Sequence, residues 1–251
     1  MNLINISTFG DYYIEKYLND YDIKILLENW WEATIFLFSH IFYQGRKDVI
    51  SERVKERAID IFKNYFSDEK RNTAFKKMEK DDFKEVRKEL LNVIGPQKVG
   101  KTRDIDMTID CLKFIGKLPD KNIVKYSKKE VENRNLYNHY NELLKLIQIG
   151  PKIASFYLRD VVMLFNLDNI LNNVDYKILQ PIDTWVKRIA KEFNIITGNE
   201  NDNEIREKII NICLKNNVSP LKYNAGTWYV GSHSFDIVME NIDKICYRQS
   251  Q

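Results

Sequence analysis

The segment that decides the fold runs from Glu142 to Phe165 and reads ELLKLIQIGPKIASFYLRDVVMLF. Its apolar residues recur at helical spacing on both sides of Gly150, and Pro151 follows that glycine directly. Glycine can adopt the positive φ of a tight turn, and proline is tolerated in the first turn of a helix, where its missing N–H costs no hydrogen bond. The segment therefore predicts a helix, a tight turn and a second helix, whose first amide groups point outward as an anion site.

A second segment, QPIDTWVKRIAK, spans Gln180 to Lys191 and predicts an amphipathic helix that opens on Asp183. An aspartate at this position accepts hydrogen bonds from the first backbone N–H groups, so helix capping is its simplest role. Residues 127–130 read SKKE, a capping-box pattern that predicts the start, at Ser127, of the helix entering the turn.

Helical periodicity covers most of the remaining chain, and nine glycines and five prolines in 251 residues are too few for a sandwich or a barrel. The sequence therefore predicts an all-α fold. The other helices are expected over residues 11–20, 22–43, 49–66, 83–94, 105–115, 202–215, 220–230 and 233–245.

Composition restricts the kind of protein. The net charge is only +3, so affinity for nucleic acid would come from local basic patches. Cys111, Cys213 and Cys246 are odd in number and widely spaced, which predicts free, mostly buried thiols in a reducing compartment. No histidines lie at metal-ligand spacing, and the most apolar run, residues 30–43, contains Glu32 and is too short for a bilayer. We expect an intracellular monomer of the cytoplasm or nucleoid, without a membrane segment, metal or cofactor.

Together, the two segments resemble the helix-hairpin-helix superfamily of base-excision DNA glycosylases. Their signature is Leu-Pro-Gly-Val-Gly-x-Lys-x-Ala, followed downstream by Pro-Val-Asp-x-x-Val-x-Arg. The pattern's proline and first glycine are replaced by Ile147 and Gln148. The matching positions are Leu146, Ile149, Gly150, Lys152 and Ala154 in the first part, and Pro181, Ile182, Asp183, Val186 and Arg188 in the second.

The resemblance implies catalytic roles for Lys152 and Asp183. A lysine at the position of Lys152 marks the bifunctional branch, in which the amine captures C1′ of the sugar and the resulting Schiff base permits strand cleavage. The carboxylate of Asp183 would stabilise the cationic sugar and assist proton transfer. The apolar residues that follow Lys152 are expected to enclose its amine and favour the neutral form. The alternatives are a phosphate contact for Lys152 and simple capping for Asp183.

The resemblance also implies DNA contacts and a pocket for the extruded base. Gln44 is expected to fill the space that the base leaves, or to be a plain helix cap. The remaining expected DNA contacts are Arg46, Lys47, Lys98, Lys101, Gly150 and Pro151, and the expected base pocket is formed by Asn224, Trp228 and Trp185. Ordinary core packing is the alternative for the tryptophans, and it is expected for Trp30 and Trp31. Residues 95–103 fit a nucleotide-binding loop formally, but no strand precedes them, so a phosphate-contacting or solvated loop is expected.

Three features are similar to the archaeal 8-oxoguanine glycosylase branch: the long link from Lys152 to Asp183, the glycine-basic segment after Ile94, and residues 219–224 with Trp228. The implied fold has two helical lobes, residues 1–31 with 132–251 carrying the hairpin and residues 32–131, beside a central cleft. The implied function is a DNA glycosylase and AP lyase that removes 8-oxoguanine from double-stranded DNA. A glycosylase for another damaged base, or a non-catalytic DNA-binding module, remains the alternative.

Overall fold

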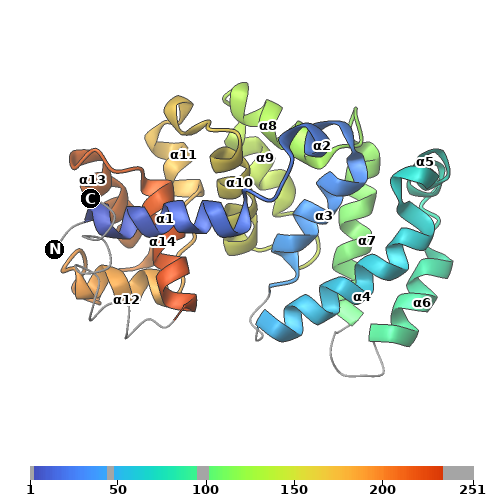
Figure 1. Cartoon of the computed structure of the whole chain (residues 1–251), viewed down its shortest axis with the longest axis horizontal. Helices are drawn as coiled ribbons and strands as arrows, with labels where there is room; N and C mark the ends of the chain where they lie inside the picture. Colours follow the sequence, from blue (N-terminus) through green and yellow to red (C-terminus); the bar gives the residue numbers. More distant parts are fainter. Residues whose placement is uncertain (1–2, 44–47, 95–101, 234–251) are drawn as a thin grey trace. The chain divides into compact units, whose positions relative to one another are not determined.

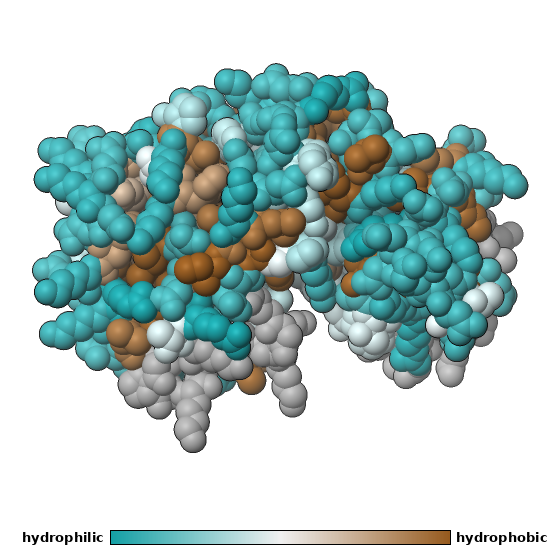
Figure 2. All heavy atoms as spheres, turned by 180° about the vertical axis from the view of Figure 1, so that it is seen from behind, coloured by the Kyte–Doolittle hydropathy of each residue, from teal (hydrophilic) through white to brown (hydrophobic). Residues whose placement is uncertain are grey.

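The structure is a computed structural model that describes residues 3–43, 48–94 and 102–233. Over these ranges the chain forms helices, turns and loops, with no strand, so the predicted all-α class is confirmed (Figure 1). No helix in the described ranges is both long and apolar enough to cross a bilayer. Hydrophilic side chains cover most of the face seen in Figure 2, with apolar groups interspersed.

The chain divides into two compact units. Unit 1 contains residues 1–21 and 158–251, and unit 2 contains residues 22–157. The boundaries thus fall after residues 21 and 157 rather than at the expected 31 and 131. As a consequence, Lys152 belongs to unit 2 and Asp183 to unit 1, and the helix α10 (Pro151–Leu164) begins in one unit and ends in the other.

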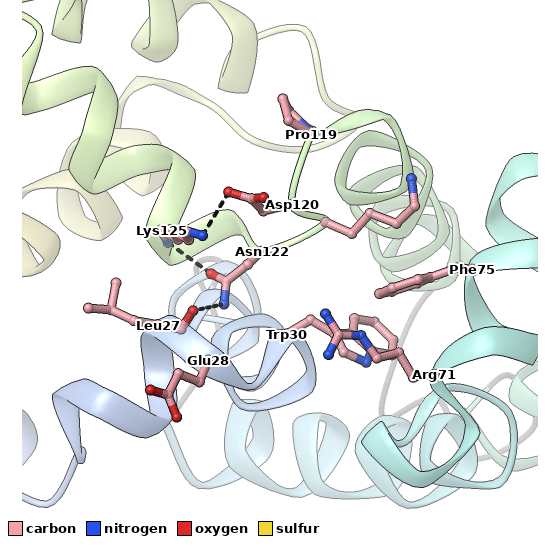
Figure 3. Close-up of a pocket in the computed structure, with 10 residues that line it drawn as sticks. Leu27, Glu28, Trp30, Arg71, Phe75, Pro119, Asp120, Asn122 and Lys125 are labelled. Atoms are coloured by element: carbon pink, nitrogen blue, oxygen red, sulfur yellow. Dashed lines mark hydrogen bonds and ion pairs between the residues drawn. The ribbon is translucent and has the colours of Figure 1, made fainter.

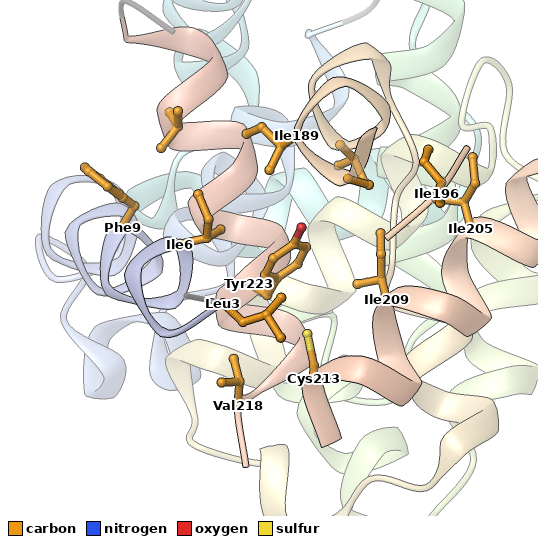
Figure 4. Packing of buried hydrophobic residues seen from close by; sticks show 13 residues of the cluster. Leu3, Ile6, Phe9, Ile189, Ile196, Ile205, Ile209, Cys213, Val218 and Tyr223 are labelled. Atoms are coloured by element: carbon orange, nitrogen blue, oxygen red, sulfur yellow. The ribbon is translucent and has the colours of Figure 1, made fainter. Parts of the chain in front are cut away.

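In unit 1, α1 and α14 cross in close contact with each other (Figure 1). Gly10 and Gly226 make this approach possible, since a Cβ on either would come within 3.0 Å of a backbone carbonyl oxygen, of Lys222 and of Ile6 respectively. Tyr223 lies in the middle of the buried cluster beneath them (Figure 4). The helices of unit 1 besides α10 are α1 (Leu3–Tyr17), α11 (Asn173–Ile178), α12 (Thr184–Glu192), α13 (Asp202–Lys215) and α14 (Pro220–Ser232), with a 3₁₀ turn at Asp168–Ile170.

Unit 2 shows that the predicted helix 22–43 is in fact two helices. Asn29 ends the first in an extended conformation, and its side chain then caps the second by accepting from the N–H groups of Trp31 and Glu32. Trp30 and Trp31 are buried in the core, as predicted. The helices are α2 (Ile23–Glu28), α3 (Trp30–Ile41), α4 (Asp48–Phe66), α5 (Arg71–Glu79), α6 (Lys84–Ile94), α7 (Thr102–Lys117), α8 (Ile123–Glu132) and α9 (Leu136–Leu143), with a 3₁₀ turn at Asp68–Lys70.

The predicted capping box at Ser127 is wrong. Helix α8 begins four residues earlier, because Asn122 caps it by accepting from the N–H of Lys125 at 2.8 Å. The Asn122 amide also donates to the carbonyl oxygens of Leu26 and Leu27, so a tertiary contact fixes the cap. Ser127 lies inside the helix, and its hydroxyl donates to the Ile123 carbonyl.

Candidate functional site

The segment that resembles the glycosylase hairpin forms a turn between α9 and α10. The N–H of Ile149 donates to the carbonyl of Leu146 at 3.1 Å, and the N–H of Ala154 donates to that of Gly150 at 3.1 Å. The left-handed residue is Gln148, with φ 64°, so the prediction that Gly150 supplies the positive φ is wrong. Gln148 stands where the resembled pattern has its first glycine, and glutamine adopts this conformation at a steric cost that glycine avoids.

A carboxylate from α7 holds this turn. Oδ2 of Asp110 accepts a hydrogen bond from the N–H of Ile147 at 2.8 Å. A Cβ added to Gly150 would meet no atom within 4 Å, so the surface in front of this glycine is open. Sequence reasoning missed Asp110, because no local pattern connects it with a turn that lies 37 residues further along the chain.

Lys152 lies exposed in the first turn of α10, next to the exposed Pro151. Its ammonium nitrogen is 5.6 Å from the centre of the Phe156 ring. Ile153 and Ala154 are buried, but they face the core from other sides of the helix. Lys152 is therefore an exposed residue in the first turn of α10, the positive end of that helix, and the expected apolar enclosure of its side chain is wrong.

Asp183 caps α12, which confirms the capping role. Its Oδ1 accepts from the N–H of Val186 at 2.9 Å, and its backbone is extended. The chain just before it is also held, since the carbonyl of Pro181 accepts from the Asn224 amide at 3.1 Å. The Asp183 carboxylate is thus positioned by a helix start and by a buried contact two residues earlier.

A buried charged cluster lies under this helix start in unit 1. Arg159 contacts Asp160 through Nε at 2.9 Å and through a terminal nitrogen at 2.7 Å, while Tyr13 donates to the other carboxylate oxygen of Asp160 at 2.5 Å. Burial and the Asp160 carboxylate raise the pKa of Tyr13 well above its usual value. Burial alone would lower the pKa of Arg159, but the neighbouring Asp160 carboxylate raises it, so that the pKa is raised overall. Arg159 and Asp160 compensate each other's charge within the core, and the neutral Tyr13 hydroxyl donates to the same carboxylate.

Asn224 belongs to this cluster rather than to a base pocket. It is 0% exposed, its carbonyl oxygen accepts from Arg159 at 2.8 Å, and its amide donates to Pro181. Neither amide group is available to read a base edge, so the expected role of Asn224 is corrected to a structural one. An Arg-Asp pair inside the apolar run of α10 was the sequence signal for such a cluster.

Both candidate pocket tryptophans are partly buried in unit 1. Trp228 packs edge-on against the rings of Tyr13 and Tyr17, with centroids 5.6 and 5.5 Å apart. Trp185 packs against Gly231 of α14, where a Cβ would collide with the indole ring. Both indoles therefore take part in helix packing, whereas Asn224 is buried.

The candidate DNA contacts lie outside the described residues: Gln44, Arg46, Lys47, Lys98 and Lys101.

Unit 2 contains a second buried polar cluster, which sequence reasoning also missed. The Ser127 hydroxyl is 2.8 Å from His139 Nε2, and His139 Nδ1 is 3.3 Å from the Glu142 carboxylate. The order serine, histidine, carboxylate is that of a hydrolytic triad. Ser127 and His139 are both 0% exposed, however, and the Ser127 hydroxyl also bonds the Tyr157 hydroxyl at 2.9 Å, so the three groups form a buried structural cluster. The cluster joins α8, α9 and α10. Burial lowers the pKa of His139 to about 4, although Glu142 acts in the opposite direction.

Two of the cysteines confirm the predicted free, buried thiols: Cys111 and Cys213. The third, Cys246, lies outside the described residues. Within the described ranges, no three histidine, cysteine, aspartate or glutamate side chains come together as a metal site.

Comparisons with known proteins identify one similar segment. No family model matches the chain, and no solved structure matches it. An uncharacterized protein of Methanocaldococcus jannaschii is 33% identical over 70 residues, which make up 28% of this chain. The chain spans only 16% of the length of that relative. The similarity therefore extends to a short segment of a longer protein.

Proposed function

We propose that this chain is a DNA glycosylase with AP lyase activity that acts as an intracellular monomer on double-stranded DNA containing a damaged base. The observation that carries the proposal is the turn between α9 and α10. It has a left-handed Gln148 where the resembled pattern has glycine, an open surface at Gly150, and an exposed Lys152 in the first turn of the following helix. This combination suits a phosphate grip beside a reactive amine.

In the proposed reaction, the neutral amine of Lys152 attacks C1′ of the sugar, and the bond from C1′ to the base breaks with its electron pair leaving on the base. The bound amine then loses a proton, its electron pair forms the C1′=N bond of a Schiff base, and the C1′–O4′ bond breaks with O4′ taking up a proton. Removal of a C2′ proton then expels the 3′ phosphate and cleaves the strand. Lys152 is exposed in the structure, so bound DNA would have to cover its amine and exclude water, which favours the neutral form.

Asp183 would provide the negative charge that stabilises the cationic sugar. Its position at the start of α12 supports this role, because the capping hydrogen bond fixes the half-buried carboxylate at a helix N-terminus. The cluster of Arg159, Asp160 and Asn224 would act by positioning, since Asn224 holds the Pro181 carbonyl.

We propose an oxidised purine such as 8-oxoguanine as the substrate. The support is the sequence resemblance alone: the long link from Lys152 to Asp183 and the segment that ends at Trp228. Since Asn224 is excluded as a reader, Trp228 and Trp185 remain the candidate aromatic walls. A glycosylase for another damaged base would use the same lysine chemistry.

Trapping with borohydride tests the proposal. A labelled duplex containing 8-oxoguanine, incubated with the protein and sodium borohydride, should give a covalent protein–DNA adduct, because reduction fixes the Schiff base. Lys152→Gln should abolish the adduct and strand cleavage while binding to the duplex persists. Lys145→Gln is the matched control, since Lys145 is an exposed lysine of the same turn.

The alternative reading, a non-catalytic DNA-binding module, makes the opposite prediction. It expects binding to damaged and undamaged duplex without any adduct. An absence of adduct across a panel of oxidised, alkylated and deaminated bases would refute the enzymatic proposal. An adduct with another lesion, but none with 8-oxoguanine, would refute only the substrate.

A further inference from the structure

Unit 2 contains a pocket of about 400 Å³ that includes none of the candidate site residues. Its volume lies within the range of small-molecule sites. Three parts of unit 2 form its walls: the junction of α2 and α3, the N-terminal half of α5, and the loop that leads into α8 (Figure 3). The residues that matter below are Trp30, Arg71, Phe75, Lys121 and Lys125.

The lining carries more positive than negative charge. It contains three cations, Arg71, Lys121 and Lys125, against the two carboxylates of Glu28 and Asp120. Lys125 pairs with Asp120 at 2.9 Å and Lys121 pairs with Glu79 at 3.5 Å, whereas Arg71 makes no ion pair with any residue in the described ranges. An arginine that lacks a carboxylate partner is a strong recognition group for an anion with two or more oxygens.

The position of Arg71 is set by an aromatic ring. Its guanidinium lies 5.4 Å from the centre of the Phe75 ring, and the Lys121 ammonium lies 5.6 Å from the same centre. Both cations therefore contact the same ring at the pocket wall, and Lys121 also pairs with Glu79 at 3.5 Å, which leaves Arg71 as the cation that lacks a carboxylate partner among the described residues. The N-terminus of α8, capped by Asn122 in the pocket wall, adds to the positive potential.

The pocket also contains a buried donor without an acceptor. Trp30 lines it, is fully buried, and its indole N–H finds no hydrogen-bond partner among the described residues. A buried unsatisfied donor costs free energy that a ligand oxygen would recover. The Phe75 ring packs edge-on against the Trp30 ring, with centroids 5.1 Å apart, so a rotation of Phe75 would open the way to this N–H.

We propose that this pocket binds a small phosphorylated molecule, with its phosphoryl group on Arg71 and one oxygen directed to the Trp30 indole. A phosphoryl group matches the site because it offers several acceptor oxygens and more than one negative charge, whereas a carboxylate offers two oxygens and one charge. The site is separate from the proposed glycosylase reaction, so either proposal can fail without affecting the other.

Calorimetric titration of the whole protein with inorganic phosphate, adenosine 5′-monophosphate and acetate tests this. Phosphate or the nucleotide should bind more tightly than acetate, and Arg71→Gln should weaken that binding by about tenfold or more. Lys88→Gln, an exposed lysine of α6 outside the pocket, should bind as the wild type does. Tighter binding of the nucleotide than of phosphate would identify an organic phosphate ester as the ligand, and equal binding would identify the phosphoryl group alone.

The indole N–H gives a second readout. In ¹H–¹⁵N spectra the Trp30 side-chain signal, assigned with Trp30→Phe, should shift on addition of phosphate as the N–H gains an acceptor. The proposal is overturned if neither phosphate nor the nucleotide binds at millimolar concentration, or if acetate binds as tightly. Unchanged affinity in Arg71→Gln would overturn it as well.

Discussion

Acid should destabilise unit 2 through His139. The pKa of this histidine is about 4 in the folded protein, against an ordinary value of 6.5. Between these values the unfolded chain binds a proton that the folded protein excludes, so stability falls as the pH falls through 6.5 and continues to fall until about pH 4. Between pH 7 and pH 5 the two pKa values correspond to a loss of about 2 kcal/mol from this one side chain.

The groups that face His139 determine this loss. Glu142 favours the protonated ring, while the Ser127 hydroxyl and the Tyr126 ring face it as neutral groups, and the Tyr157 hydroxyl in turn bonds Ser127. The free energy of unfolding should be measured with urea at pH 7 and pH 5 for the wild type and for His139→Gln, which does not titrate. His40→Gln, at a partly buried histidine of α3, is the matched control.

The wild type should lose about 2 kcal/mol more than His139→Gln over this interval, and His40→Gln should behave as the wild type does. Equal losses in the wild type and in His139→Gln would refute the reasoning. If His139→Gln does not fold, an NMR titration of the His139 ring in the wild type still decides, because a folded pKa near 6.5 would contradict the burial argument.

Two further predictions concern the packing of unit 1 and the candidate carboxylate. Gly226→Ala should lower the free energy of unfolding by about 3 kcal/mol, because the added methyl group meets the Ile6 carbonyl. Gly150→Ala is the control, and since its methyl group meets open space it should change that free energy by less than about 1 kcal/mol. Similar urea midpoints for the two variants would disprove the close approach of α1 and α14. Asp183→Asn should cost no more than about 1 kcal/mol of stability, yet slow base release at least about 100-fold in single-turnover assays. A loss of stability with unchanged turnover would leave Asp183 as a helix cap alone.

Local signals predicted most helices but not the directions in which their side chains point. The starts at Asp183 and Pro220 were predicted because the capping residue and the proline act on their immediate neighbours. The break at Asn29 is not predicted, because the apolar periodicity continues through it. The cap at Asn122 is not predicted either, because it depends on hydrogen bonds with α2. Arg71–Glu79 was not predicted at all, since its apolar stripe is weak.

The candidate site shows the same limit at single residues. The pattern placed Lys152 correctly at a helix start but gave the wrong surroundings, because which side of α10 is buried depends on distant helices. Asn224 is expected in a base pocket because it lies one helical turn from Trp228. Its partner Arg159 lies 65 residues earlier, a separation that no local pattern records.

The close crossing of α1 and α14 has a consequence for the order in which the chain folds during translation. Residues 3–17 leave the ribosome well before their partner helix, residues 220–232, is synthesised. Unit 2 is continuous from residue 22 to residue 157, so its contacts can form while synthesis proceeds. Until α14 has been synthesised, α1 has no partner to cover Ile6 and Phe9. Contacts between residues so far apart in the sequence also form slowly. Nascent chains halted before residue 220 should therefore bind chaperones through this helix.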